Sequence, residues 1–360
     1  MTSLNIAHQR LHNQHIVSAT FEKPGDVVQW LGAVQAQDYA AAKWALGLRS
    51  QGVTDPDIEQ AFTDGTILRT HVMRPTWHFV TPADIRWMLT LTAPRVHALN
   101  AYYYRRLELD DATFMRSNTV LAKALQGGKQ LTRPELVAVL QHAGIATHDF
   151  LRFGYLMIRA ELDGIVCSGG RRGKQHTYAL LDERAPQART LARDEALAEL
   201  AKRYFTGHGP ATLKDYIWWS GLSAADAKAG LEMIKPQLFH EVVDGQTYWF
   251  AASMLAAKDI APTAYLLPNF DEYIVGYTDR SAVFEASHTK KLDSRGNVLF
   301  SHTIVIDGQI VGTWRRTLKK NTVVIEVKPF TPLNEAETRA FAIAAERYGR
   351  FLGTPATLPT

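Results

Sequence analysis

The sequence predicts an α+β protein in which three similar helical units precede a β-rich domain. Helical periodicity gives way to a short two-stranded pattern three times before residue 258, whereas strand patterns dominate from 259 to 334. One amphipathic helix follows them. We therefore expect domains at 1–110, 111–185, 186–258 and 259–334, then a helix and tail over 335–360, with the Pro- and Thr-rich residues from Gly353 disordered.

Length and composition narrow the class of protein. A chain of 360 residues with 46% hydrophobic residues supports several packed domains. The single cysteine, Cys167, excludes internal disulfides and a cysteine-based zinc site, and its place in a predicted strand favours a buried thiol. Neither a signal peptide nor a run of bilayer-spanning length is present, so we expect a cytoplasmic protein without a membrane partner. The net charge of +4 is compatible with a nucleic-acid partner but does not establish one.

The first unit is predicted to contain three helices and a two-stranded ribbon. The helices begin near residues 5, 26 and 55, and the first carries Arg10 on its wetter side. The strands cover 66–73 and 76–80, an order of elements typical of a winged helix. A helix over 82–106 follows, and the tyrosines and arginines at its end either stack on bases or pack between domains.

Gln35 and Gln37 form an unusual polar pair just after the second of these helices. Gly32 loosens the end of that helix, and strand-like alternation from Val34 would put both amides on one face. The alternative is a structural role, in which both amides form hydrogen bonds with backbone groups in a turn.

The second unit ends in a glycine-rich basic hairpin. Thr132 and Glu135 have the spacing of a capping box, which starts one helix, and another helix runs to Leu162. Two strands follow within 165–180, and the tip between them is predicted to be a wing that contacts DNA phosphates. The alternative is a loop kept charged for solubility. The cations of the tip are Arg171, Arg172 and Lys174.

The third unit repeats the order of the second. A helix is expected over 191–205, a second begins at the capping box of Thr212 and Asp215, and Ser223 caps a third. A hairpin turns at residues 244–245. Together the three units predict tandem winged-helix, or helix-turn-helix, modules.

The C-terminal part is predicted to be a small β-barrel, because closure buries strands without open edges. Strands are expected at 265–267, 273–275, 298–302, 303–306, 310–316 and 322–327, with a helix over 335–351. One hairpin is basic and is predicted either to probe the minor groove of DNA or to form a solvated rim. Its residues are Trp314, Arg315, Arg316, Lys319 and Lys320.

Other catalytic motifs are missing from the sequence. The 13 histidines show no metal-ligand spacing, and no Walker loop, dinucleotide fingerprint or Gly-x-Ser-x-Gly elbow is present. We therefore expect neither a metal nor a cofactor. Asp271 and Glu272 lie beside Arg280 in the sequence, and we interpret them as a salt-bridge network at a domain junction, not an acid/base pair.

Three segments resemble the AlkZ-like family of winged-helix DNA glycosylases. They are 34–38, 68–87 with its Arg-Pro-Thr-Trp-His-Phe-Val run, and 267–273 with Gly276, Asp279 and Arg280 after it. The likeness covers nearly the whole chain and implies three tandem winged helices and a β-barrel that form a C-shaped clamp on DNA. Gln35-Ala36-Gln37 matches the family's catalytic Gln-x-Gln motif, whereas Asp38 stands one place too late for a related Gln-x-Asp branch.

The resemblance implies removal of N3- or N7-alkylated purines, and in some members the unhooking of interstrand crosslinks. Such a base already carries a positive charge and leaves without protonation, so the enzyme must position a water and stabilise an oxocarbenium-like sugar. The carbonyl oxygens of Gln35 and Gln37 can do both. We expect a monofunctional hydrolase that acts as a monomer on double-stranded DNA with alkylated bases, associated with the nucleoid. Whether the base is flipped stays open.

Two other functions agree with tandem winged helices. One is a transcription regulator whose barrel binds an effector, which requires sequence-specific binding well above that to random duplex. The other is a non-catalytic protein that recognises damaged DNA.

Overall fold

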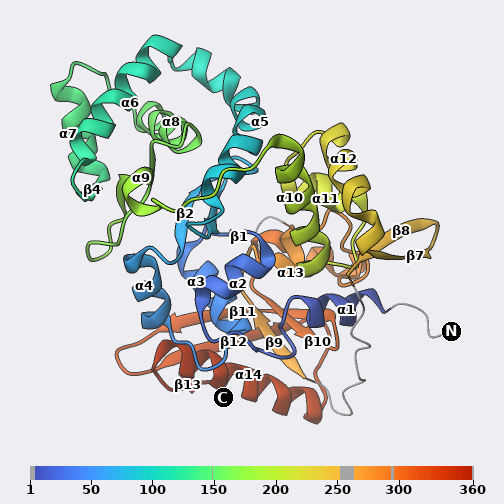
Figure 1. Ribbon diagram of the computed structural model, residues 1–360. Helices are drawn as coiled ribbons and strands as arrows, with labels where there is room; N and C mark the ends of the chain where they lie inside the picture. Colours follow the sequence, from blue (N-terminus) through green and yellow to red (C-terminus); the bar gives the residue numbers. More distant parts are fainter. Residues whose placement is uncertain (1–4, 148, 252–262, 293–295, 359–360) are drawn as a thin grey trace.

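The computed structural model describes residues 5–147, 149–251, 263–292 and 296–358 and has a mixed α+β fold (Figure 1). The described residues form two three-stranded sheets, a two-stranded ribbon and one five-stranded sheet. The predicted boundary between 258 and 259 lies outside the described residues. Within them, no helix is long and apolar enough to cross a membrane.

The first unit holds one helix and one strand more than the sequence predicts. Asp38 caps the additional helix, α3, by accepting a hydrogen bond from the backbone of Ala41. Gly32 ends α2 with a φ of +78°, and the chain then enters β1, which pairs with β3 in the order β1-β3-β2. The elements are α1 (Ile6–Asn13), α2 (Pro24–Leu31), β1 (Val34–Gln35), α3 (Tyr39–Arg49), α4 (Asp55–Asp64), β2 (Leu68–His71) and β3 (Trp77–Val80).

The sequence predicts that Arg10 lies on the solvent-facing side of α1. The structure buries it instead. Its guanidinium lies 3.5 Å from the centre of the Tyr277 ring and 3.9 Å from the carboxylate of Asp215. The prediction is wrong because elements distant in the sequence cover this face of the helix, and local periodicity carries no information about them.

The second unit contains the predicted helices and hairpin strands, and the structure adds β4 and α9 to them. The capping box of Thr132 and Glu135 is present at the start of α7, and Cys167 is buried in β5. Tyr103 stacks on Tyr155 of α8 at 5.0 Å, which confirms the packing interpretation for that tyrosine. Helix α5 (Ile85–Arg106) closes the first unit. The elements of the second unit are α6 (Asp111–Leu125), β4 (Leu131–Thr132), α7 (Arg133–His142), α8 (Phe150–Leu162), β5 (Val166–Ser168), β6 (Thr177–Leu180) and α9 (Leu181–Arg184).

The third unit contains the predicted caps and ribbon. Thr212 and Asp215 form the capping box of α11, and Ser223 caps α12. The antiparallel ribbon turns at Asp244 and Gly245, both with positive φ, as hairpin turns of this kind require. The elements are α10 (Arg193–Gly207), α11 (Leu213–Ser220), α12 (Ala224–Ile234), η1 (Lys235–Gln237), β7 (Phe239–Val243) and β8 (Gln246–Phe250).

The C-terminal sheet is a curled half-barrel, not a closed barrel. Its strand order is β13-β12-β11-β10-β9, so β13 and β9 form its two edges. The tail expected to be disordered instead supplies β13, which pairs in parallel with β12. The elements are β9 (Ala264–Leu267), α13 (Glu272–Val275), η2 (Ala286–Lys291), η3 (Val298–Phe300), β10 (Thr303–Ile306), β11 (Gln309–Leu318), β12 (Val323–Pro329), α14 (Glu335–Leu352) and β13 (Ala356–Thr357).

Two predicted strands of this region are helical turns. Residues 273–275 lie in α13, because the side chain of Asp271 accepts a hydrogen bond from the backbone of Tyr273 and caps the turn. Residues 298–300 form η3, capped in the same way by Asn297. The β-branched and aromatic content of both segments favours strands, and the local caps override it.

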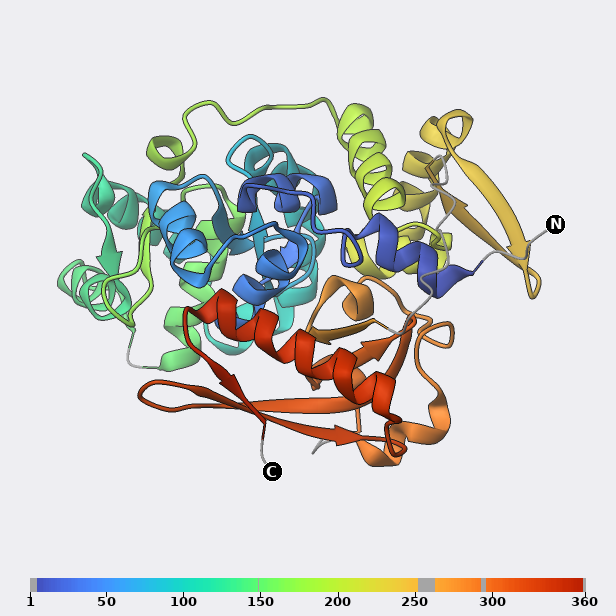
Figure 2. The same ribbon diagram turned by 90° about the horizontal axis from the view of Figure 1, so that it is seen from below.

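A single hydrophobic core joins the N-terminal helices to this C-terminal sheet. Helix α14 packs against the sheet, and Figure 2 shows that it lies obliquely across the strands. Its Tyr348 packs edge-on against Trp44 of α3 and against Trp314 of β11, with ring centres 4.9 and 5.1 Å apart. The first and last parts of the chain therefore fold against one another.

Candidate active site

Gln35 is held by two charged side chains from distant parts of the chain. Its backbone N–H donates to Oε1 of Glu272 at 2.8 Å, and its side-chain Oε1 accepts from Nη2 of Arg74 at 2.8 Å. Arginine can only donate, so the amide oxygen of Gln35 must face Arg74 and its NH₂ group must point elsewhere. Only 7% of Gln35 is exposed, and its position in β1 opposite His78 fixes its backbone.

Gln37 lies beyond the end of β1 and is exposed. The backbone N–H of Trp77 donates to its Oε1 at 3.4 Å, while the carbonyl of Trp77 accepts from the backbone of Ala36 at 2.7 Å. The strand-like alternation expected from Val34 therefore stops at Gln35. The amide of Gln35 is fixed by Arg74, whereas that of Gln37 is at the surface.

Glu272 is fully buried and connects three parts of the fold. Besides the Gln35 backbone, its carboxylate accepts from Nε2 of His208 at 3.1 Å and from Nε1 of Trp219 at 3.0 Å. Burial favours the neutral acid, but the hydrogen bond and charge of His208 outweigh it and hold the pKa of Glu272 below its ordinary value. The carboxylate is therefore ionised at neutral pH.

The predicted network around Asp271, Glu272 and Arg280 has different partners. Asp271 pairs with Arg49 of α3 through two hydrogen bonds of 2.8 and 2.9 Å. Arg280 donates to the backbone carbonyls of Ile274 and Thr278, at 3.0 and 3.2 Å. Asp271 thus forms an ion pair between distant segments, as the sequence predicts, but the contact of Glu272 with Gln35 is not predicted. The two residues are 237 positions apart, and no local signal indicates that they meet.

His78, which lies opposite Gln35, is neutral at physiological pH. It is fully buried, and Nδ1 pairs with the carbonyl of Thr76 at 3.0 Å. Burial and the positive charge of Arg74 lower its pKa to about 3. It is therefore poorly suited to accept a proton near neutral pH.

The predicted wing packs close to the segment that follows Gln37. Arg171 pairs with Glu59 of α4 at 3.2 Å and lies 5.1 Å from the ring centre of Tyr39. Arg172 pairs with Glu135 at 2.7 Å. Lys174 is exposed at the tip. Two of the three predicted DNA-contacting cations are thus engaged with carboxylates.

The predicted probing hairpin consists of β11, β12 and the turn between them. Trp314 is only 2% exposed, and its indole donates to the carbonyl of Leu267 at 2.9 Å, which corrects the expectation that it lies on the hairpin surface. It faces the core because side chains alternate along a strand. Arg315, Lys319 and Lys320 are exposed, whereas Arg316 is half-buried against Tyr348.

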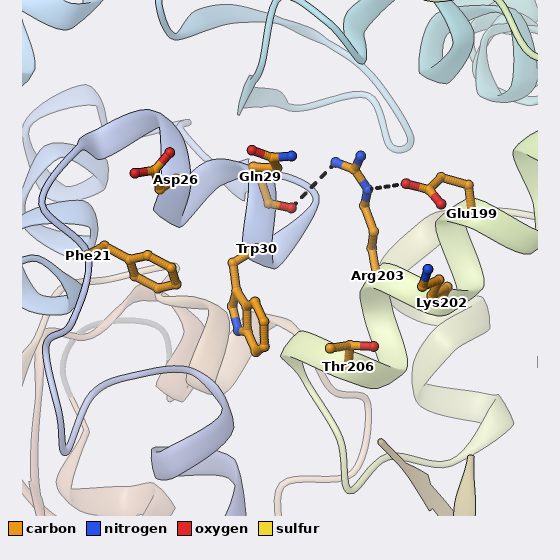
Figure 3. A pocket seen from close by; sticks show the side chains of 8 residues that line it. All are labelled: Phe21, Asp26, Gln29, Trp30, Glu199, Lys202, Arg203 and Thr206. Carbon is orange, nitrogen blue, oxygen red and sulfur yellow. Dashed lines mark hydrogen bonds and ion pairs between the residues drawn. The ribbon is translucent and has the colours of Figure 1, made fainter. Parts of the chain in front are cut away.

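A separate pocket of about 480 Å³ lies between α2 and α10 (Figure 3). Arg203 crosses it, donating to Glu199 at 2.8 Å and to the carbonyl of Gln29 at 3.4 Å. None of the residues that line it is a predicted site residue. Among the residues that the structure describes, no cluster of His, Cys, Asp and Glu could hold a metal ion.

The relatives of this chain share both its sequence pattern and its fold. The family model described as DNA glycosylase AlkZ-like matches residues 28–351. The chain belongs to the AlkZ-like DNA glycosylase family. The enzymes of this family are hydrolases, because a DNA glycosylase hydrolyses the bond between base and sugar, which agrees with the enzyme class predicted from the sequence.

Two known proteins are similar to this chain. The interstrand DNA cross-link repair glycosylase of Streptomyces sahachiroi is 27% identical over 318 residues, which are 85% of this chain and 85% of that protein. The solved structure of Streptomyces sahachiroi DNA glycosylase AlkZ superimposes with a TM-score of 0.82 at 23% identity, covering 99% of this chain and 98% of that one. The second comparison establishes that the fold is shared.

Proposed function

We propose that this AlkZ-like protein hydrolyses the N-glycosidic bond of N3- and N7-alkylated purines in double-stranded DNA, with Gln35 and Gln37 as its catalytic residues. The observation that supports this most directly is the pair of amides, one fixed by Arg74 and Glu272 and the other exposed. An alkylated purine is already a good leaving group, so no strong acid is needed. Amide oxygens suffice to orient a water and to face a developing cation.

The wider fold supports a role for the chain as a clamp on DNA. We assign winged-helix units to 1–110, 111–185 and 186–258, the curled sheet to 259–334 and the closing helix and tail to 335–360, and we propose that they form a C-shaped clamp. Each of the three units combines helices with a small antiparallel sheet or ribbon. The proposed phosphate contacts are Arg171, Arg172, Lys174, Arg315, Arg316, Lys319 and Lys320. The protein would act as a monomer on nucleoid DNA in the cytoplasm.

Interstrand crosslinks are the second proposed substrate. The Streptomyces sahachiroi relative is an interstrand DNA cross-link repair glycosylase, and it aligns with this chain over 85% of both lengths. A crosslinked base is tethered to both strands and cannot be flipped freely, so crosslink unhooking would require access to the sugar without full extrusion of the base.

The test is release of the modified base from a duplex that contains one N7-methylguanine. Purified wild-type protein is expected to produce abasic sites, detected as strand breaks after alkali, above the spontaneous loss from the same duplex. The Gln35→Ala/Gln37→Ala variant should be slower by at least about a hundredfold, because preorganised groups at the reacting centre contribute that much.

Gln29→Ala is the matched control, because Gln29 is an exposed glutamine on the neighbouring helix α2. It should retain wild-type activity. A wild-type protein without activity on alkylated and crosslinked duplexes, or a double variant as active as the control, would overturn the proposal. A crosslinked duplex in the same assay separates the two substrates.

A further inference from the structure

Gln35 is fixed at its backbone and at its side chain by two charged groups that the proposed reaction does not consume. Such restraint matters because an amide side chain can rotate to offer either its oxygen or its NH₂ group to the reacting centre. A group that is misplaced by about 1 Å costs on the order of a hundredfold in rate. Whatever holds Gln35 therefore controls its contribution.

Arg74 fixes the position of the Gln35 amide oxygen, which keeps a second lone pair with which it can accept from a water. Arg74 lies in the turn between β2 and β3, and its Nη2 donates to the Gln35 oxygen at 2.8 Å. Its guanidinium is 5.6 Å from the ring centre of Trp218, which lies on α11 in the third unit. Side-chain packing across two units therefore keeps Arg74 in place.

Glu272 determines where the backbone of Gln35 lies. Its Oε1 accepts from the Gln35 N–H, and its Oε2 accepts from His208 and Trp219. With all three donors directed at one ionised carboxylate, a lateral movement of β1 would break a charge-assisted hydrogen bond in a fully buried setting.

The charges of these two residues also fit the proposed reaction. A lone arginine beside a centre that stabilises a cationic sugar would repel both substrate and transition state. Glu272 supplies a compensating negative charge. Burial lowers the pKa of Arg74, and of the surrounding charges that of Glu272 does most to raise it again. Glu272 therefore offsets the positive charge of Arg74 close to Gln35.

We infer that Arg74 and Glu272 are positioning residues, which act through Gln35 by fixing the orientation of its amide and the location of its backbone. This inference rests on the proposed catalytic role of Gln35. Neither residue is required to touch DNA.

A double-mutant cycle between Arg74→Met and Gln35→Ala tests the inference in single-turnover assays on the N7-methylguanine duplex. Arg74→Met alone should slow base release by about tenfold to a hundredfold, with little change in DNA affinity. In the Gln35→Ala background the same change should have almost no further effect, because the group through which Arg74 acts is missing. Additive losses would overturn the inference.

Conservative variants separate positioning from simple instability. Arg74→Lys keeps one donor and should recover part of the rate lost in Arg74→Met, and Glu272→Gln should slow base release because an amide cannot accept on both sides. The matched control is Arg280→Met, because Arg280 lies 5.8 Å from the same Trp218 ring but bonds to backbone carbonyls. The control should behave like wild type. A loss of DNA affinity and a shallower salt dependence in Arg74→Met would instead make Arg74 a phosphate contact.

A crystal structure of Arg74→Met gives a result that does not depend on activity. The Gln35 amide should turn or occupy two orientations, and an unchanged, well-defined side chain would contradict the inference even in an active enzyme. If wild-type protein is inactive on every alkylated duplex, the proposed function fails, but this structural comparison still decides whether Arg74 orients Gln35.

Discussion

Burial lowers the pKa of three histidines far enough to keep them neutral at physiological pH. His78 is fully buried and its pKa is lowered to about 3, and burial lowers the pKa of His302 and of His176 to about 4. In the unfolded chain each would titrate near 6.5. The folded protein therefore binds fewer protons than the unfolded chain between these values.

The stability of the protein should consequently fall in mild acid. Above pH 6.5 a histidine is neutral in both states and has no effect; as the pH falls toward 3, only the unfolded state gains its proton and is favoured. The free energy of unfolding should drop by roughly 1.4 kcal/mol per pH unit for each such histidine. Urea unfolding at pH 7.5, 6.5 and 5.5 measures this slope.

His78→Phe isolates the contribution of one histidine. The variant loses the hydrogen bond to Thr76 and is expected to be less stable at every pH, but its slope below pH 6.5 should be shallower than that of wild type. An identical slope in the two proteins would show that His78 titrates normally in the fold.

At the scale of single elements, the β11–β12 hairpin is a proposed contact with DNA. Its turn residues Lys319 and Lys320 are exposed, and Leu318 beside them is 65% exposed. Trp314 and the inner face of the hairpin belong to the core, so only the turn and the outer face are available to a partner.

Removing both turn lysines should weaken DNA binding without destabilising the protein. Lys319→Ala/Lys320→Ala is expected to lower affinity for any duplex and to reduce the slope of log K against log salt by about 2, if each lysine contacts one phosphate. Lys290→Ala, an exposed lysine on η2, is the control and should leave the slope unchanged. Fluorescence anisotropy between low and moderate salt measures the affinity and its salt dependence. If wild type and the double lysine variant have the same slope, the hairpin is not part of the DNA interface.

The elements also show which kinds of information the sequence carries. The boxes at Thr132–Glu135 and Thr212–Asp215 were predictable because both partners lie within one turn of helix. The side chains of residues 273–275 predict a strand, yet Asp271 caps them as a helical turn. The sequence predicts a closed barrel because closure leaves no strand edge exposed. This argument does not determine whether a sheet curls far enough to close.

For the molecule as a whole, the buried pair of Arg49 and Asp271 links α3 to the start of the C-terminal region. The side chains are 1% and 0% exposed, and their closest atoms are 2.8 Å apart. Arg49 also donates to Gln14 at 2.7 Å, which extends the link to the segment after α1. Contacts of this range, like that of Glu272 with Gln35, could not be read from local sequence patterns, because nothing in either partner's neighbourhood specifies the other.

Breaking this pair from one side should be costly. Arg49→Met leaves the carboxylate of Asp271 buried without its partner and is expected to lower the free energy of unfolding by roughly 3–5 kcal/mol. Arg49→Met/Asp271→Asn should recover part of this loss, because the buried charge is gone. Urea unfolding of the three proteins measures the difference. A double variant no more stable than the single one would show that packing, not charge, dominates at this site.

The bond between Glu272 and Gln35 has a consequence for when the enzyme becomes active. Ribosomes make Gln35 early and Glu272 237 residues later. A nascent chain that carries the whole Gln-x-Gln motif still lacks the carboxylate that fixes it. With Gln35 in its proposed catalytic role, base removal is expected to begin only after the C-terminal region has emerged and docked, so unfinished chains near DNA would be inert.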